Sequence, residues 1–241
     1  KIKDNSVYIK TIAAALKDPS PRIRKLAISA IDLTKNDQSK AMLKDIENIA
    51  QNDPKTLVQA EAIAALGKLK DKKYAALYEK GIAAISNSVK GQSLFAISQI
   101  NVDQAKQLAD KVDLTNASED LISNLLPFIV NNKIESQLPN IGSLVAFYPF
   151  IKFQNTELGE IAENGYNWIM TSNNTEATEN VTKILRRAKS ELDTNPQAKM
   201  MVIKIMKEGL AKKMQTLKEN PNDKGLHKQV ELINEEIKNY N

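Results

Sequence analysis

The pattern that decides the fold lies in residues 18–31, which read DPSPRIRKLAISAI. Residues 53–66, which begin 35 positions later, read DPKTLVQAEAIAAL and repeat that pattern in character. Both stretches open with Asp-Pro and continue with apolar residues at three- and four-residue spacing, which is the period of one helix face. Self-similarity at a fixed period indicates a repeat architecture. The sequence therefore predicts stacked helical repeats in its N-terminal half.

Each Asp-Pro predicts the start of a second helix, at Asp18 and at Asp53. An aspartate carboxylate accepts hydrogen bonds from free N–H groups there, and proline supplies the backbone angle of the first turn. The apolar faces expected on these two helices are Ile23, Ala27 and Ile31, then Val58, Ala62, Ala65 and Leu66. A third copy without Asp-Pro, shifted by 31 residues, is expected to bury Val89, Ser93, Leu94, Ala96 and Ile97.

A first helix with the same period precedes each second helix. The apolar positions expected on the first helices are Ile9, Ile12 and Leu16, then Leu43, Ile46, Ile49 and Ala50, then Leu77, Ile82 and Ile85. A helix pair of this size cannot bury its apolar stripe alone, so each pair must pack on its neighbours.

After about residue 100 the repeat fades, but the helical period continues. Helices are expected over 102–112, 118–132, 138–148, 156–171, 175–192, 196–217 and 223–240. The first turn of 102–112 is expected to be capped or charged by Asp103, and the last four helices are expected to be capped by Thr156, Thr175, Asn195 and Asp223. A strand is the alternative for 138–148, although Pro139, Gly142 and Pro149 would cut it short. We predict an all-α chain, with helix pairs in residues 1–115 and irregular helices in 116–241 that continue the same α-α superhelix.

The composition excludes several classes of catalytic site. The chain has no cysteine, and His227 is its one histidine. Most hydrolytic, metal and acid/base sites use at least one imidazole, and many use two or three. The sequence also lacks Gly-x-Ser-x-Gly and Ser-x-x-Lys. We therefore expect that the chain itself is not an enzyme, and we assign no catalytic, cofactor-binding or metal-binding residue to it.

Two clusters of ionisable residues can be interpreted either as functional sites or as ordinary solvent-exposed surface. His227 and Glu231 are four residues apart and could share a metal ion, or they are surface residues near the start of the last helix. Glu157, Glu160 and Glu163 share one helix face, as a pair of catalytic carboxylates might require. Carboxylates in a first turn are also favoured by the helix dipole, which makes a solvated face the preferred interpretation.

Three other groups have both a structural and a functional interpretation. Gly67-Lys68 and Gly91-Gln92-Ser93 lack the further glycines of a phosphate-binding loop and are interpreted as a helix C-cap and a repeat joint. A local basic stripe, which an acidic partner could contact, consists of Lys183, Arg186, Arg187 and Lys189. The aromatic residues that either line a groove or fill the core are Tyr148, Phe150, Phe153, Tyr166 and Trp168.

The net charge is +5, with a calculated pI of about 9.1, but the basic residues are nearly all lysine. Phosphate and base recognition favour arginine and need clustering, so we expect no nucleic-acid partner. No stretch is long and apolar enough for a membrane span, so we expect no membrane partner. The chain starts at Lys1 without methionine, and we expect it to be a piece of a longer polypeptide. Its compartment stays open, since a signal on a removed segment would allow a periplasmic or extracellular location.

The segments around residues 18–31 and 53–66 resemble HEAT repeats, whose second helix opens after Asp-Pro with an apolar-Arg pair such as Ile23-Arg24. On a larger scale, helix pairs followed by Asn87-Ser88-Val89 and then by irregular helices resemble the C-terminal region of bacterial alanyl-aminopeptidase-like zinc metallopeptidases (gluzincins). The catalytic elements of that family, His-Glu-x-x-His and Gly-x-Met-Glu-Asn, are absent here. No catalytic or zinc-binding residue is therefore carried over.

Two functional hypotheses follow. In the first, implied by the resemblance, the chain is the non-catalytic helical domain of a zinc aminopeptidase. Its partners would be the catalytic domain of the same polypeptide, which would hold the zinc, and peptide substrates in a concave groove. In the second, the chain is a freestanding HEAT-like scaffold that binds a protein or peptide. The peptide preference and the oligomeric state stay open.

Overall fold

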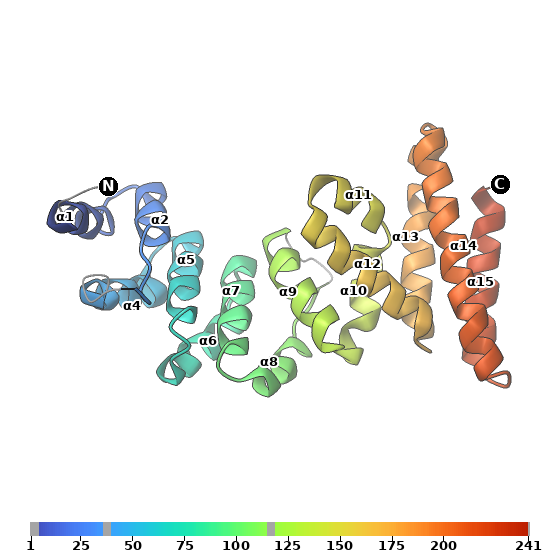
Figure 1. The fold of residues 1–241 in the computed structure, drawn as a ribbon, viewed down its shortest axis with the longest axis horizontal. Coiled ribbons are helices and arrows are strands. Elements are labelled where there is room, and N and C mark those ends of the chain that lie inside the picture. The colour runs from blue at the N-terminus through green and yellow to red at the C-terminus, as the bar shows by residue number, and fades with distance from the viewer. Residues whose placement is uncertain (1–4, 36–39, 115–118, 241) are drawn as a thin grey trace. The chain divides into compact units, whose positions relative to one another are not determined.

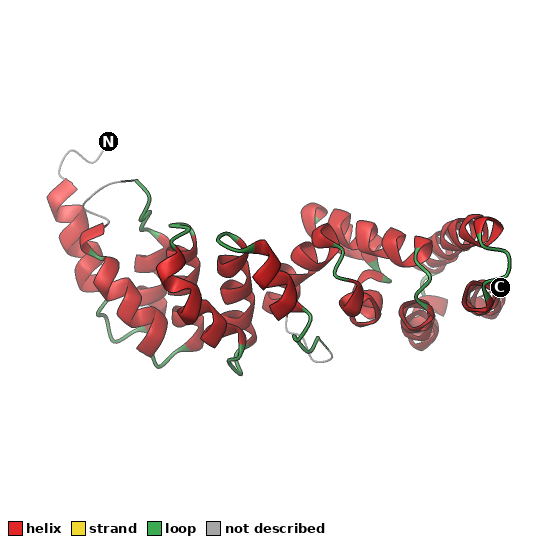
Figure 2. Ribbon diagram, turned by 90° about the horizontal axis from the view of Figure 1, so that it is seen from below, coloured by secondary structure: helices red, strands yellow, loops and turns green. Residues whose placement is uncertain are grey.

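The computed structural model describes residues 5–35, 40–114 and 119–240. Within these ranges all regular secondary structure is helical, which confirms the predicted all-α class (Figure 2). The chain divides into two compact units, Lys1–Leu125 and Leu126–Asn241. The predicted boundary between residues 115 and 116 lies outside the described residues. That boundary, and the continuation of one superhelix through both units, stay predictions.

The first unit is built from helix pairs. Helix α1 packs on α2, α4 on α5, and α6 on α7, while the second helices α2, α5 and α7 pack on one another in that order (Figure 1). The elements are α1 (Asn5–Ala15), α2 (Pro21–Ser29), α4 (Leu43–Asn52), α5 (Thr56–Gly67), the 3-10 helix η1 (Lys72–Tyr74), α6 (Ala75–Ile82), α7 (Asn87–Ser98) and α8 (Val102–Ala109). Helix α8 ends before the predicted residue 112, and Asn101 caps it rather than Asp103, which lies in its first turn.

The second helices begin later than predicted, at Pro21 and Thr56 rather than at Asp18 and Asp53. The Asp18 carboxylate accepts from the backbone N–H of Ser20 at 2.7 Å, and that of Asp53 accepts from Lys55 at 2.9 Å. An aspartate that binds the backbone two residues ahead forms a local turn that competes with the helix. Each aspartate therefore shapes the loop that enters the helix.

An arginine joins the first two repeats. The Arg24 guanidinium on α2 donates to both carboxylate oxygens of Asp53, at 2.7 and 2.9 Å. Its remaining nitrogen donates to the backbone carbonyls of Asp18 and Pro19, at 2.8 and 3.0 Å. The Asp53 side chain is 3% exposed, so this planar two-bond pair ties α2 to the entry loop of α5 in a nearly dry environment.

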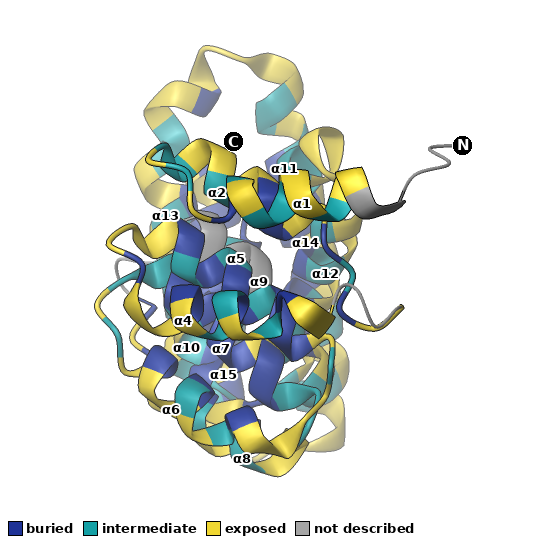
Figure 3. Cartoon of the chain, turned by 90° about the vertical axis from the view of Figure 1, so that its left-hand side faces the viewer, coloured by how far each residue is buried: buried dark blue, intermediate teal, exposed yellow. Residues whose placement is uncertain are grey.

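The core of the first unit follows the predicted pattern at most positions, but Ile9, Ile12, Leu43 and Leu77 are only half-buried and two other positions are exposed (Figure 3). The predicted faces of α5 and of the third copy are buried: Val58, Ala62, Ala65 and Leu66, then Val89, Ser93, Leu94, Ala96 and Ile97. Ile23 is 42% exposed and Ile85 is 98% exposed, so both predictions were wrong. Ile23 lies in the first turn of α2, and the residues that this helix buries are Ala27 and Ile28, further along it. Ile85 lies in the loop between α6 and α7.

The second unit begins within α9 and ends with four long helices. Helix α10 packs on α12 and α13, α11 on α12, and α14 on α12, α13 and α15. The elements are α9 (Glu119–Asn132), the 3-10 helix η2 (Glu135–Gln137), α10 (Leu138–Val145), α11 (Tyr148–Gln154), α12 (Thr156–Thr171), α13 (Thr175–Asp193), α14 (Pro196–Glu219) and α15 (Lys224–Tyr240). The predicted helix over 138–148 is a helix rather than a strand, but it ends at Val145, and after a turn the separate helix α11 begins with Pro149 in its first turn.

Two predicted helix caps in this unit were wrong by one residue. The side chains of Asn155 and Asn174 accept hydrogen bonds from free N–H groups in the first turns of α12 and α13, so Thr156 and Thr175 are the first helical residues. Asparagine ranks above threonine as an N-cap, which explains the choice between neighbours. Asn195 caps α14 as predicted, and Asp223 accepts from the first N–H groups of α15. In the part of the chain that the structure describes, no helix is both long and apolar enough to cross a membrane.

Candidate functional site

The second helices of the first unit turn equivalent positions toward solvent. Three positions on each helix, separated by three or four residues, are exposed or half-buried. They are Arg22, Leu26 and Ser29 on α2, Leu57, Glu61 and Ala64 on α5, and Ser88, Gln92 and Phe95 on α7. Because α5 packs on both α2 and α7, these nine residues form one surface, which we call the α2–α5–α7 face.

Each helix of this face exposes one large apolar side chain. Leu26 is 69% exposed, Leu57 is 53% exposed and Phe95 is 46% exposed. A single exposed leucine needs no explanation, but an apolar group on each of three neighbouring helices is typical of an interaction surface. The repeat pattern of the sequence indicates that these positions face away from the core, but it does not single them out as a binding surface, because their residue types differ from repeat to repeat.

The α2–α5–α7 face carries little negative charge. Glu61 is its one carboxylate, and its Oε1 accepts from the Ser29 hydroxyl at 2.8 Å. The Lys25 ammonium lies 3.9 Å from Glu61 Oε2, and Arg22 is exposed at the edge of the face. The apolar side chains are thus surrounded by groups whose net charge is neutral to positive.

The His227 and Glu231 pair lies on the outer side of α15, where both residues are exposed. The His227 ring nitrogen Nε2 is 2.8 Å from the carbonyl oxygen of Pro221, to which it donates. Among the described residues no group of three or more His, Asp or Glu side chains is arranged to hold a metal ion. The position of His227 agrees with the surface interpretation.

The glutamates of α12 do not share one environment. Glu163 Oε2 accepts from the Lys152 ammonium of α11 at 3.0 Å, while Glu157 and Glu160 are exposed. An acid/base pair needs two carboxylates held around one reacting group in surroundings that separate their pKa values, whereas Glu157 and Glu160 are both exposed to solvent. This arrangement instead fits a solvated first turn with one ion pair to the neighbouring helix.

The basic stripe on α13 is partly neutralised. Arg186 Nε lies 2.7 Å from Glu236 Oε2 on α15, and Lys189 Nζ lies 2.5 Å from Asp193 Oδ2. Lys183 and Arg187 are exposed on the same helix. The four residues therefore do not act as one cationic patch.

Of the two glycine interpretations one is confirmed and one was wrong. Helix α5 ends at Gly67 with Lys68 as its C-cap, as predicted, although Gly67 has no positive φ. A Cβ added to Gly67 would lie 2.9 Å from the Cβ of Ala96, which shows that the residue permits the close approach of α5 and α7. Gly91 is buried within α7 and does not form a joint.

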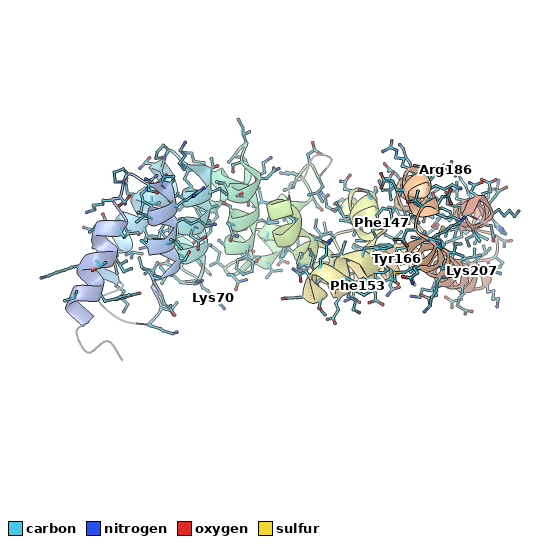
Figure 4. The ribbon with its side chains drawn as sticks, turned by 90° about the horizontal axis from the view of Figure 1, so that it is seen from above. Lys70, Phe147, Phe153, Tyr166, Arg186 and Lys207 are labelled. Atoms are coloured by element: carbon cyan, nitrogen blue, oxygen red, sulfur yellow. The ribbon has the colours of Figure 1, made fainter. Side chains whose placement is uncertain are left out.

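The aromatic residues separate into core and surface. Tyr148 and Tyr166 are buried with their ring centroids 5.4 Å apart, and the Tyr166 hydroxyl donates to the Ile205 carbonyl at 2.9 Å. Burial raises the pKa of Tyr148 to about 12. Trp168 is 8% exposed, which agrees with the core interpretation, but Phe153 on α11 is 80% exposed (Figure 4).

A groove of about 840 Å³ lies between α4 and α6, on the side of the first helices. Its rim holds Glu47, whose Oε1 accepts from the Tyr74 hydroxyl at 2.6 Å and lies 3.3 Å from the Lys73 ammonium. The Tyr74 hydrogen bond, followed by the contact with Lys73, outweighs burial and holds the pKa of Glu47 below its ordinary value. Glu47, Tyr74 and Lys73 therefore bind one another, and their polar groups are not free to bind a ligand in the groove.

Comparison with known proteins agrees with this geometry. Residues 9–98 match the family model of HEAT repeats. No curated protein matches the chain. The crystal structure of an engineered protein, a Northeast Structural Genomics Consortium target, aligns with 97% of this chain and 97% of its own at 14% identity, with a TM-score of 0.39. Residues 9–98 are therefore similar to HEAT repeats, in agreement with the paired helices of the first unit.

Proposed function

We propose that this chain is a non-catalytic helical scaffold that binds a polypeptide through the α2–α5–α7 face. The observation that carries the proposal is the exposure of Leu26, Leu57 and Phe95 on three helices that pack side by side. Helical repeats present extended surfaces of this kind, and exposed side chains on successive helices can follow a bound segment from one repeat to the next. Burial of such side chains would supply most of the binding free energy.

The charges around the face favour a particular partner chemistry. Arg22 is exposed, and the single carboxylate, Glu61, already has Lys25 and Ser29 as partners. A cationic segment would find little to pair with there, whereas an acidic segment would find Arg22. The expected partner is therefore a polypeptide segment with several apolar side chains and few positive charges.

A peptide-display selection tests this proposal. The chain is used to select from a random peptide library, and the affinity of the selected peptides is then measured by titration. The variant with Leu26→Ser, Leu57→Ser and Phe95→Ser should bind at least about tenfold more weakly, because each truncation removes part of the apolar contact. The matched control is Phe153→Ser, which removes a more exposed apolar side chain from the other unit.

The selection also has outcomes that refute the proposal. The proposal is refuted if the library yields no enriched sequence. It is also refuted if the selected peptides bind the triple variant and the wild type with equal affinity. Equal loss of affinity in Phe153→Ser and in the triple variant would indicate non-specific apolar adhesion. Circular dichroism checks that each variant keeps its helical content.

We propose, as the particular setting of this scaffold, the helical domain of a zinc aminopeptidase. The support is the order of features in the sequence: HEAT-like pairs, then Asn87-Ser88-Val89, then longer irregular helices. In this setting the partners would be a catalytic domain on the same polypeptide and the peptides that enter it. The sequence encoded upstream of Lys1 is the test. A zinc motif His-Glu-x-x-His there would support the setting, and a start codon directly before Lys1 would refute it.

The non-catalytic role has its own test. The isolated chain with added zinc should not hydrolyse aminoacyl-p-nitroanilide substrates above the rate of a buffer control. Hydrolysis that co-purifies with the chain and is abolished by a chelator would contradict the proposal.

A further inference from the structure

An open surface pocket of about 450 Å³ lies in the C-terminal unit among α9, α12 and α14. Its volume falls within the range of roughly 300–1,000 Å³ that small-molecule sites occupy. The residues that line it are Val130, Asn131, Lys133, Asn164, Asn167, Trp168, Thr171 and Lys212. Two of these are cationic, five carry neutral hydrogen-bonding groups, and none is acidic. This pocket is separate from the α2–α5–α7 face.

Lys133 occupies a position that glycine normally fills. It follows the end of α9 with a φ of 52°. The N–H of Ile134 donates to the Ile129 carbonyl at 3.2 Å and that of Lys133 to Val130 at 3.4 Å. These two bonds define a Schellman motif, in which the left-handed residue is usually glycine because a side chain is disfavoured there. Because lysine is disfavoured at this position, its side chain is a candidate for a functional role.

The Lys133 side chain is directed over Trp168. Its ammonium lies 4.6 Å from the centroid of the indole ring, which is within the range of a cation–π contact. Neither this ammonium nor that of Lys212 forms an ion pair with a described carboxylate. Their positive charges are therefore available to a ligand.

Lys212 orients a neighbouring amide. Its ammonium donates to Oδ1 of Asn167, and because an ammonium can only donate, this contact fixes the amide so that Nδ2 remains as a donor. Asn131 and Asn164 add two further side-chain amides to the lining. The pocket thus combines two cations with amide donors, which is the chemistry that stabilises an oxyanion.

We propose that this pocket binds a small organic anion, a carboxylate or a phosphate ester, with its charged group between Lys133 and Lys212. The amides of Asn131, Asn164 and Asn167 would bind the remaining oxygens of the ligand. The absence of a lining carboxylate removes the internal partner that pairs with lysines elsewhere in this unit, such as Lys152 and Lys228.

The position of Trp168 provides a direct test, because it is the single tryptophan of the chain and lines this pocket. Its fluorescence is titrated with inorganic phosphate and, separately, with citrate, at constant ionic strength maintained with sodium chloride. The response should saturate with at least one of the two. Saturation with citrate alone assigns a carboxylate ligand, and saturation with phosphate alone assigns a phosphate ligand.

Three variants show whether the response comes from this pocket. Lys133→Gly and Lys212→Gln should each weaken binding about tenfold, because each removes one charge-assisted contact. Lys133→Gly also relieves the left-handed lysine, so the free energy of unfolding should stay equal or rise while binding is lost. Lys204→Gln is the matched control, since Lys204 lies on α14 outside the pocket and its side chain is 77% exposed.

The inference is overturned if phosphate and citrate change the fluorescence no more than sodium chloride does. It is also overturned if the response saturates equally well in Lys133→Gly, in Lys212→Gln and in the wild type. Neither outcome bears on the α2–α5–α7 face, which peptide selection tests separately.

Discussion

The Arg24 and Asp53 side chains show how one residue pair joins two repeats. Burial alone would raise the pKa of the Asp53 carboxyl, but the hydrogen bond from Arg24, that from the Lys55 N–H and the guanidinium charge together hold the pKa below its ordinary value. The folded state therefore binds the proton less readily than the unfolded state. The stabilisation is present above the unfolded pKa of about 4 and is lost as the pH falls through the depressed folded value.

Replacing Arg24 should cost more than a typical surface substitution. Arg24→Gln leaves the Asp53 carboxylate, 3% exposed, without its charged partner. We expect the free energy of unfolding in urea at pH 7 to fall by about 3 kcal/mol. Arg22→Gln, which changes an exposed arginine two residues away, should change it by less than about 0.5 kcal/mol. Equal effects of the two substitutions would show that the pair does not stabilise the fold.

Lys213 is a buried amine without a carboxylate. Its ammonium nitrogen donates to the carbonyls of Ile169 and Ser172, at 2.7 and 2.5 Å, at the C-terminal end of α12. Burial lowers the pKa of Lys213 from 10.5 to about 7. A neutral amine still has two N–H groups, so it can serve both carbonyls after it loses its proton.

This burial predicts an unusual pH dependence. Between pH 7 and pH 10 the unfolded state binds a proton at Lys213 that the folded state has released, so stability rises with pH. From pH 7 to 9 we expect a contribution of about 2 kcal/mol to the free energy of unfolding in the wild type. Lys213→Met should remove most of this rise, whereas Lys204→Met should retain it. A wild-type pH dependence that persists in Lys213→Met would contradict the assignment.

At the scale of elements, Gly159 sets the distance between α11 and α12. A Cβ added there would lie 2.3 Å from the Cα and 2.6 Å from the backbone nitrogen of Lys152. Because these are backbone atoms, the helices would have to separate. We expect Gly159→Ala to lower the free energy of unfolding by about 3 kcal/mol, measured by urea denaturation.

Gly225 is the matched control for that substitution. It lies in the first turn of α15, and the nearest atoms to an added Cβ are side-chain oxygens at 3.1 Å or more. The contact is tight, but alanine is the better helix former, so Gly225→Ala should change stability by less than about 1 kcal/mol. An equally small effect at Gly159 would show that α11 can move away from α12 at little cost.

Many of the helix limits were predictable from the sequence. Helix α12 has the predicted limits, residues 156 and 171, because its apolar period is long and its flanking loops are polar. The caps at Asn155 and Asn174 were missed because each asparagine stands next to a threonine that can also cap. The helix starts after Asp18 and Asp53 were missed because a carboxylate can bind within its own loop as well as at a helix end.

At the scale of the whole molecule, the repeat could be read from the sequence but the binding surfaces could not. Periodicity identifies which side of α2, α5 and α7 is buried, since burial repeats at equivalent positions. The outer side varies from repeat to repeat, as Leu26, Glu61 and Gln92 show at one equivalent position. The anion pocket was hidden for another reason, because Lys133, Trp168 and Lys212 are distant in sequence and only the packing of three helices brings them together.

The central claim is that residues 9–98 present a polypeptide-binding face. The most direct test is to add a selected peptide to the uniformly ¹⁵N-labelled chain and to follow the amide chemical shifts by nuclear magnetic resonance. The account predicts that saturable shifts gather on the amides around Leu26, Leu57 and Phe95 and that they disappear in the triple serine variant. Shifts centred on α14 or on the groove between α4 and α6, with the α2–α5–α7 face unchanged, would contradict it.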